Sequence, residues 1–141
     1  MKTKLLYVHN GIFPANSANR TQVINMCNEF SKKIKTTLLA FGKSKKEIKD
    51  FYKINNRLRI NIVKPRGNYY LRSIILFLKF LTLKKEFNII FTRDLLFAYL
   101  TKLFYKNKKV IYELHEIPEK NLWEKLFKKT STCTMGNYYW A

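Results

Sequence analysis

Two side chains in this sequence are well suited to ligand chemistry, and each follows a run of apolar residues. The guanidinium of Arg93 could bind a phosphate or sugar hydroxyls through its paired donors, or it could pair with Asp94 or Glu116. The imidazole of His115 could bind a ligand or transfer a proton near neutral pH, or it could serve only in folding. We name His115 as the candidate catalytic residue and Arg93 as a candidate substrate-binding residue.

Small polar residues gather in residues 9–19, which read HNGIFPANSAN. The only glycine there is Gly11, so the G-x-G-x-x-G pattern of dinucleotide-binding loops is missing, and we do not expect NAD or FAD. Asn16, Ser17 and Asn19 stand at the start of a predicted helix, where they could hold an anion or hydroxyl groups. The alternative is an ordinary connection with a helix cap. The other candidate substrate-binding residues are Gly11, Asn16, Ser17 and Asn19.

The candidate residues stand between segments whose apolar patterns predict alternating strands and helices. We predict strands at residues 4–9, 36–41, 58–63, 87–91 and 110–114, and helices at 19–34, 44–52, 70–84, 94–105 and from 121 onward. Asn19 with Gln22, and Ser44 with Glu47, are predicted to cap two of these helices. The alternation predicts an α/β fold with a Rossmann-like, doubly wound parallel sheet of about five strands.

The expected strand order decides where a ligand would bind. Right-handed crossovers favour the order 3-2-1-4-5. Ligands of open parallel sheets bind beyond the carboxyl ends of the strands, at the point where the order reverses. That point lies between the first and fourth strands, where residues 9–19, 92–94 and 113–119 are expected to converge.

The composition is strongly basic. Lys and Arg number 28 against 9 Asp and Glu in 141 residues, a formal charge of +19. Such a charge favours an anionic partner, which could be a membrane surface, phosphorylated ligands or nucleic acid. The alternative is that AT-rich coding DNA explains much of the excess, because such DNA enriches Lys, Asn, Ile, Phe and Tyr together. The lysines are also scattered along the chain and do not form one stripe. No nucleic-acid-binding motif is present, so nucleic acid is the least favoured of these partners.

Several other site types are missing from the sequence. There is no Ser-His-Asp set, no P-loop and no His/Cys cluster with metal-ligand spacing, so no metal or organic cofactor is expected. Cys27 and Cys133 do not form a disulfide framework, and no signal peptide precedes the first strand. A cytoplasmic location is the simplest expectation.

Three segments resemble the N-terminal half of bacterial family 4 glycosyltransferases. They are YVHNGIFPANSANRTQVINMCNEFSKK, IIFTRDLLFAYLTKLF and KVIYELHEIP, and the likeness covers roughly residues 3–128. The resemblance implies one half of a GT-B fold, in which the N-terminal domain holds the acceptor and the C-terminal domain holds the nucleotide sugar. It also implies metal-independent transfer with retention of anomeric configuration.

Site roles follow from the same resemblance. Residues 11–19 would face the donor phosphates and the acceptor, and His115 would contact the transferred sugar. The segment departs from the pattern of many members because it lacks a Gly-Gly pair, which puts close backbone approach to a diphosphate in doubt. The expected ligands are a nucleotide sugar and a cell-surface polysaccharide or lipid-linked acceptor.

We predict that residues 1–129 form the glycosyltransferase 4-like, Rossmann-like N-terminal domain. Residues 130–141, TSTCTMGNYYWA, are predicted to be an uncharged tail of aberrant character. A second domain with the paired-glutamate donor site is not expected within the chain, so we predict a truncated enzyme that is inactive alone. The alternative is a non-catalytic, membrane-docked subunit that pairs with a separate donor-binding chain. Reading the DNA downstream of codon 129 in all frames would separate these hypotheses.

The helix predicted at residues 70–84, YLRSIILFLKFLTLK, is unusually apolar. Arg72 and Lys79 share one narrow face of it, and the stretch is shorter than the roughly 20 residues that span a bilayer. It could dock peripherally on the inner face of the cytoplasmic membrane. The alternative is a crossover helix packed on the sheet, with both basic side chains reaching solvent.

Overall fold

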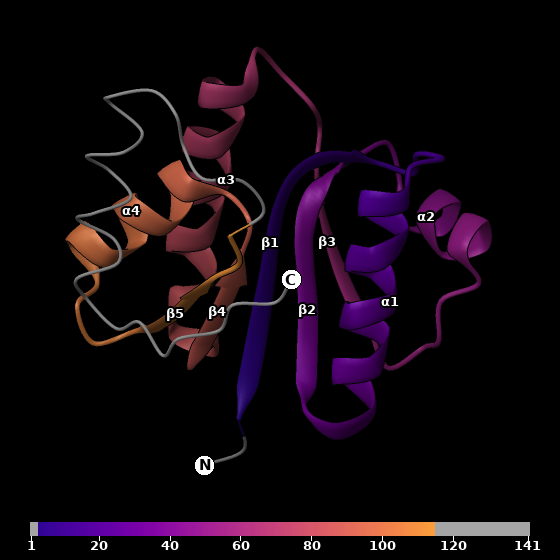
Figure 1. The fold of residues 1–141 in the computed structure, drawn as a ribbon, viewed down its shortest axis with the longest axis horizontal. Helices are drawn as coiled ribbons and strands as arrows, with labels where there is room; N and C mark the ends of the chain where they lie inside the picture. The colour runs from indigo at the N-terminus through magenta and orange to yellow at the C-terminus, as the bar shows by residue number, and fades with distance from the viewer. Residues whose placement is uncertain (1–2, 115–141) are drawn as a thin grey trace.

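A computed structural model describes residues 3–114, which form a five-stranded sheet with two helices on each side (Figure 1). The strands are β1 (Lys4–Phe13), β2 (Lys35–Gly42), β3 (Arg59–Val63), β4 (Ile89–Thr92) and β5 (Lys109–Tyr112). All neighbouring pairs are parallel, and the order is β3-β2-β1-β4-β5. The predicted fold class and strand order are therefore confirmed.

The helices are α1 (Ala18–Lys33), α2 (Lys45–Tyr52), α3 (Tyr69–Leu83) and α4 (Leu95–Phe104), and a short 3-10 turn, η1 (Lys84–Glu86), follows α3. Helices α1 and α2 cover one face of the sheet, and α3 and α4 cover the other (Figure 1). Each face has its own apolar cluster, which includes Tyr7 and Leu38 of the sheet beneath α1 on one side and Phe80 of α3 and Phe97 of α4 on the other. This two-sided burial explains why the central strands are nearly continuous apolar runs.

The helix starts are fixed by polar caps. Ser44 accepts a hydrogen bond from the Glu47 N–H at 3.1 Å, as predicted for α2. At α1 the predicted cap was wrong, because Ser17, not Asn19, accepts the N–H of Arg20. Helix α1 begins at Ala18, which places Asn19 inside its first turn and leaves its side chain available for another contact.

Strand β1 is longer than the sequence predicts. The predicted strand ended at His9, where polar residues begin, but β1 continues to Phe13 because Ile12 and Phe13 pair with Phe41 and Gly42 of β2. A Cβ on Gly42 would lie 2.6 Å from the Phe13 carbonyl oxygen, so this close pairing requires glycine at that position. The connection to α1 is therefore only residues 14–17.

The final predicted helix, His115 and the uncharged tail lie outside the described residues. Within residues 3–114, no helix has the length and apolar character needed to cross a membrane.

Candidate functional site

The carboxyl end of β1 contains a bulge at the point where the strand order reverses. His9, Asn10 and Gly11 stand opposite the single residue Ala40, because the register passes from Val8–Leu39 to Ile12–Phe41. Bulges of this kind redirect side chains and are common beside functional sites. Here the bulge sends Asn10 toward α3 and α4, and Gly11 toward α1.

Gly11 is buried against the ring of His9. The Gly11 N–H donates to His9 Nδ1 at 2.8 Å, and the His9 ring lies edge-on to Phe13, with centroids 5.4 Å apart. A Cβ on Gly11 would lie 2.7 Å from the imidazole and 3.0 Å from Arg20 Nε. The position therefore excludes any side chain, and the role that the structure gives Gly11 is to keep the bulge tightly packed.

Asn10, Ser73 and Asp94 form a buried polar cluster that joins β1, α3 and α4. Asn10 Nδ2 donates to Asp94 Oδ2 at 2.8 Å and to the Tyr69 carbonyl at 3.0 Å, and it lies 2.6 Å from Ser73 Oγ. The Ser73 hydroxyl donates to the same Asp94 oxygen at 2.6 Å. The other carboxylate oxygen caps α4 by accepting the Phe97 N–H at 3.1 Å. One carboxylate thus organises three elements.

The environment of Asp94 disfavours its charge. The side chain is buried, and this burial raises the pKa of Asp94 against the hydrogen bonds from Ser73, the Phe97 N–H and Asn10, which lower it. Burial, with the nearby Asp94 carboxylate, also raises the pKa of Tyr112 to about 12 and raises that of Tyr69 further. Both tyrosines therefore remain protonated at neutral pH.

Arg93 and Glu113 form an ion pair at the carboxyl ends of β4 and β5. Arg93 Nε and Nη2 donate to the two carboxylate oxygens at 2.7 and 2.8 Å, and Nη1 donates to Asn19 Oδ1 at 2.7 Å. The Tyr7 hydroxyl donates to Glu113 Oε2 at 3.3 Å. Burial alone would lower the pKa of Arg93, but Glu113 raises it above its ordinary value. The guanidinium is therefore held in one place by Asn19 of α1 and by Glu113, which follows β5 and also accepts from Tyr7 of β1.

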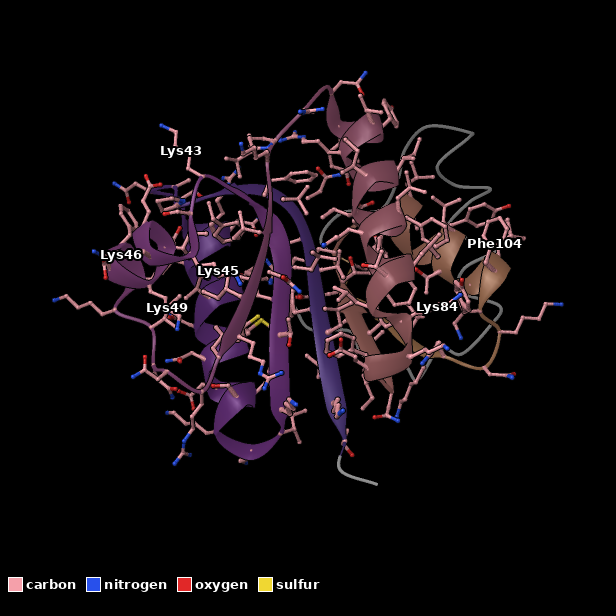
Figure 2. All side chains as sticks on the ribbon, turned by 180° about the vertical axis from the view of Figure 1, so that it is seen from behind. Lys43, Lys45, Lys46, Lys49, Lys84 and Phe104 are labelled. Carbon is pink, nitrogen blue, oxygen red and sulfur yellow. The ribbon has the colours of Figure 1, made fainter. Side chains whose placement is uncertain are left out.

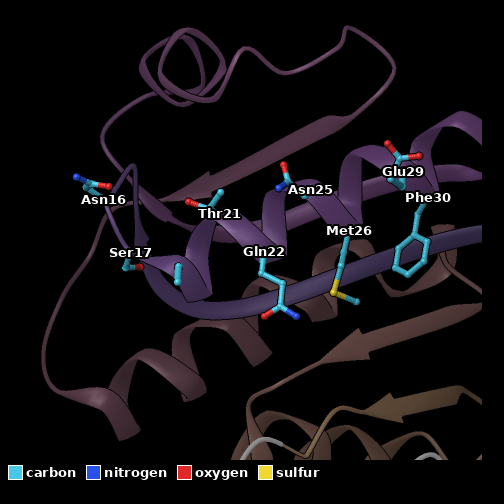
Figure 3. A pocket seen from close by; sticks show the side chains of 9 residues that line it. Asn16, Ser17, Thr21, Gln22, Asn25, Met26, Glu29 and Phe30 are labelled. Carbon is cyan, nitrogen blue, oxygen red and sulfur yellow. The ribbon is translucent and has the colours of Figure 1, made fainter. Parts of the chain in front are cut away.

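A shallow groove of about 710 Å³ follows α1 from the carboxyl edge of the sheet (Figure 3). Gln22, Met26 and Phe30 project from one side of the helix, and Phe30 reaches the ring of Phe91 on β4 at a centroid distance of 6.0 Å. The described residues that line it are Asn16, Ser17, Ala18, Thr21, Gln22, Asn25, Met26, Glu29 and Phe30. These residues present amides and hydroxyls around a small apolar strip, with one carboxylate and no basic side chain among them.

The predicted site residues separate into three groups in the structure. Asn16 and Ser17 line the groove, Asn19 is hydrogen-bonded to Arg93, and Gly11 lies inside the bulge. His115, the candidate catalytic residue, lies outside the described residues. Arg93 pairs with Glu113, a partner not considered from the sequence, whereas Asp94 bonds to Asn10 and Ser73. Glu116, the other partner considered, lies outside the described residues.

Several residues of the site were not identified from the sequence. Asn10 and Ser73 occur within strongly apolar segments, and only their contact with Asp94 reveals them. Thr21 and Asn25 were not identified either, and Gln22 was predicted only as a capping partner, although the polar residues along one half of α1 were a signal in the sequence. In the part of the chain that the structure describes, no three His, Cys, Asp or Glu side chains gather as a metal site would require.

Taken together, the described geometry offers groups that bind and orient a ligand. The groove supplies amide and hydroxyl donors and acceptors, and the two polar clusters tie together the carboxyl ends of β1, β4 and β5 and the helices beside them. Comparison with protein-family models, and with curated proteins, gives no match for this chain.

Proposed function

We propose that this domain is the acceptor-side, N-terminal half of a retaining glycosyltransferase. It would receive a cell-surface polysaccharide or a lipid-linked acceptor, to which a sugar is transferred from a nucleotide sugar. The observation that carries the proposal is the groove along α1, lined mainly by amides and hydroxyls, which opens at the carboxyl edge of a Rossmann-like sheet. The family resemblance of the sequence supports the same assignment.

The lining of the groove favours a hydroxylated ligand over an anionic one. The chain carries 28 Lys and Arg residues, yet none of the described residues that line the groove is basic. Amide and hydroxyl groups can both donate to and accept from sugar hydroxyls, while Met26 and Phe30 offer apolar contact to the C–H faces of a ring. A phosphate would find no positive side chain in this lining.

The donor would be held elsewhere under this proposal. The Arg93 guanidinium is already engaged by Glu113 and Asn19, so it is not a free phosphate clamp. In enzymes of the resembling type the nucleotide sugar lies on a second Rossmann-like domain, across a cleft from the first. His115 keeps its assignment as the residue that contacts the transferred sugar.

We expect the 141-residue chain to bind acceptor glycans without transferring sugar. Saturation-transfer NMR with a panel of glycan acceptors and nucleotide sugars should show acceptor contacts, and product analysis should show no multiple turnover. Replacing Gln22 and Asn25 together with alanine should weaken acceptor binding about tenfold, since each lost hydrogen bond contributes roughly 0.5–1.5 kcal/mol.

A matched control is available on the far side of α2. Asn56→Ala removes an exposed amide in the connection between α2 and β3, and acceptor binding should stay unchanged. Equal weakening by Asn56→Ala would show that the groove is not the site. Clear multiple turnover by the chain alone would contradict the acceptor-side assignment, because the donor would then bind without a second domain.

A second candidate function is a membrane-docked, non-catalytic subunit that recruits a separate donor-binding chain. The observation that favours it is a set of large apolar side chains exposed on α3 and α4. The same observation supports peripheral attachment to the inner face of the cytoplasmic membrane in either candidate, since a lipid-linked acceptor would lie at that surface.

A further inference from the structure

Helices α3 and α4 expose seven large apolar side chains, of which Tyr69 stands at the first position of α3. The other six are Tyr70, Leu71, Ile74 and Leu78 on α3 and Leu103 and Phe104 on α4, which we call the α3/α4 apolar surface. Leu78 is 56% exposed and Phe104 is 63% exposed. Contiguous apolar exposure of this kind marks an interaction site more often than scattered single residues do.

The six residues belong to one surface because of helix geometry and helix contact. Tyr70, Ile74 and Leu78 recur every four residues, so they follow one side of α3. The buried side of α3 is different and contains Ser73, Leu76, Phe77 and Phe80. The two helices touch through the rings of Phe77 and Phe104, whose centroids lie 5.7 Å apart, so the exposed end of α4 continues the stripe of α3.

The described charges on and next to these helices are mostly positive. Neither α3 nor α4 contains an aspartate or a glutamate, whereas lysines are exposed at Lys79 within α3, at Lys85 after α3 and at Lys106 after α4. The exposed Glu86 beside Lys85 is the opposing charge. Lys84 joins the two helices, since its Nζ donates to the Tyr105 hydroxyl at 2.8 Å and lies 4.8 Å from the centre of that ring. Figure 2 shows Lys84 and Phe104 at the same end of the molecule.

The structure corrects one part of the basic stripe predicted from the sequence. Arg72 does not stand beside Lys79 in solvent, because its guanidinium lies over the ring of Phe41, 6.0 Å from the centroid. Arg72 therefore helps to seal α3 against β2, while Lys79 remains exposed. The positive charge available to a partner comes from lysines at the border of the apolar surface.

We propose that the α3/α4 apolar surface docks on an anionic lipid bilayer. The apolar side chains would enter the boundary between headgroups and acyl chains, and the bordering lysines would meet the headgroup phosphates through their flexible stems. Charge complementarity favours this partner, because among the described residues exposed lysines outnumber the one exposed carboxylate, Glu86, next to the two helices, and such a surface matches a negatively charged interface. The inference rests on the membrane attachment proposed above, and it names the surface responsible.

The test is co-sedimentation of the full chain with vesicles of phosphatidylcholine alone or mixed with phosphatidylglycerol. We expect binding to the mixed vesicles that weakens at higher salt, and little binding to phosphatidylcholine alone. Leu78→Glu and Phe104→Glu should each lower the partition coefficient by about tenfold, or about 1.4 kcal/mol. Phe51→Glu is the matched control, since Phe51 is 52% exposed on α2, and it should change binding by less than about twofold.

Four results would overturn the proposal: no vesicle binding, equal binding to both lipid mixtures, equal loss in the Phe51→Glu control, or a lipid-free dimer that Leu78→Glu dissociates. The last result would identify a second copy of the chain as the occupant. Thermal unfolding of each variant checks folding, and Leu78→Ser tests the same position without adding charge. Because no sugar is present, failure here would leave the acceptor-binding test of the groove unaffected.

Discussion

Replacing Asp94 with alanine is expected to lower the free energy of unfolding by about 3 kcal/mol, from a lost helix cap and newly unsatisfied buried groups. The Asp94 carboxylate accepts hydrogen bonds from Asn10 and Ser73, and it caps α4 through the Phe97 N–H. Alanine would remove the acceptor that these three donors share, and the donors would stay buried. Urea unfolding followed by circular dichroism would measure the change.

The matched control for Asp94→Ala is Ser44→Ala, which removes the cap of α2 at an exposed position. That change should cost about 1 kcal/mol or less, because solvent can satisfy the freed Glu47 N–H. Similar losses in the two variants would mean that the cluster of Asn10, Ser73 and Asp94 adds nothing beyond an ordinary cap.

The same carboxylate predicts a pH dependence of stability. Burial raises the pKa of Asp94 in the folded state, so folding favours the protonated side chain. This contribution to the free energy of unfolding is fully present below the ordinary pKa of about 3.9 for an unfolded aspartate. It is lost as the pH rises through the pKa of Asp94 in the folded protein. The unfolding free energy of wild type minus that of Asp94→Asn, which does not titrate there, should therefore fall over this range. A constant difference across the range would contradict the raised pKa.

Replacing Arg93 with methionine is expected to lower the free energy of unfolding by about 2 kcal/mol, less than the cost of breaking a fully buried pair. The Arg93 side chain is 6% exposed and that of Glu113 is 26% exposed, so solvent would only partly compensate the abandoned carboxylate. Asn19 would lose its partner as well. Chemical denaturation of the variant gives the measurement.

Two further variants separate charge pairing from simple loss of a long side chain. Lys32→Met breaks the exposed pair with Glu29 and should change stability by no more than about 0.5 kcal/mol. Glu113→Gln keeps the side-chain shape but removes the negative charge, so it should be destabilising too. If Arg93→Met is as mild as Lys32→Met, Arg93 has no structural role, and its predicted ligand contact would become the better explanation.

Most of the fold could be predicted because its signals are local. The apolar runs around Leu38 and Ile90 are typical of strands buried on both faces, and the handedness of parallel crossovers then restricts the order. The cap at Ser44 was equally readable, because a capping box spans only four residues. Apolar runs and helix caps depend on residues that are close together in the chain, so they can be read directly from the sequence.

The unpredicted features depend on contacts between distant segments. Glu113 stands 20 positions from Arg93, and nothing in the spacing distinguishes it from Glu116 as a partner. Asn10 was predicted to lie in the connection after the first strand, whereas pairing with β2 carries the strand beyond it. Arg72 shares a helical face with Lys79 in the sequence, but the ring of Phe41, contributed by β2, draws the guanidinium inward.

The bulge in β1 also determines which way the end of the strand faces. Side chains alternate between the two faces of a strand, so one inserted residue inverts every later position. Three residues stand opposite one residue of β2, which is two more than regular pairing requires, and this even number leaves Phe13 in the same apolar cluster as Leu5 and Tyr7. Deleting one bulge residue would turn Phe13 toward the opposite layer, while deleting two would preserve its side. The length of β1 can therefore change here only in steps of two.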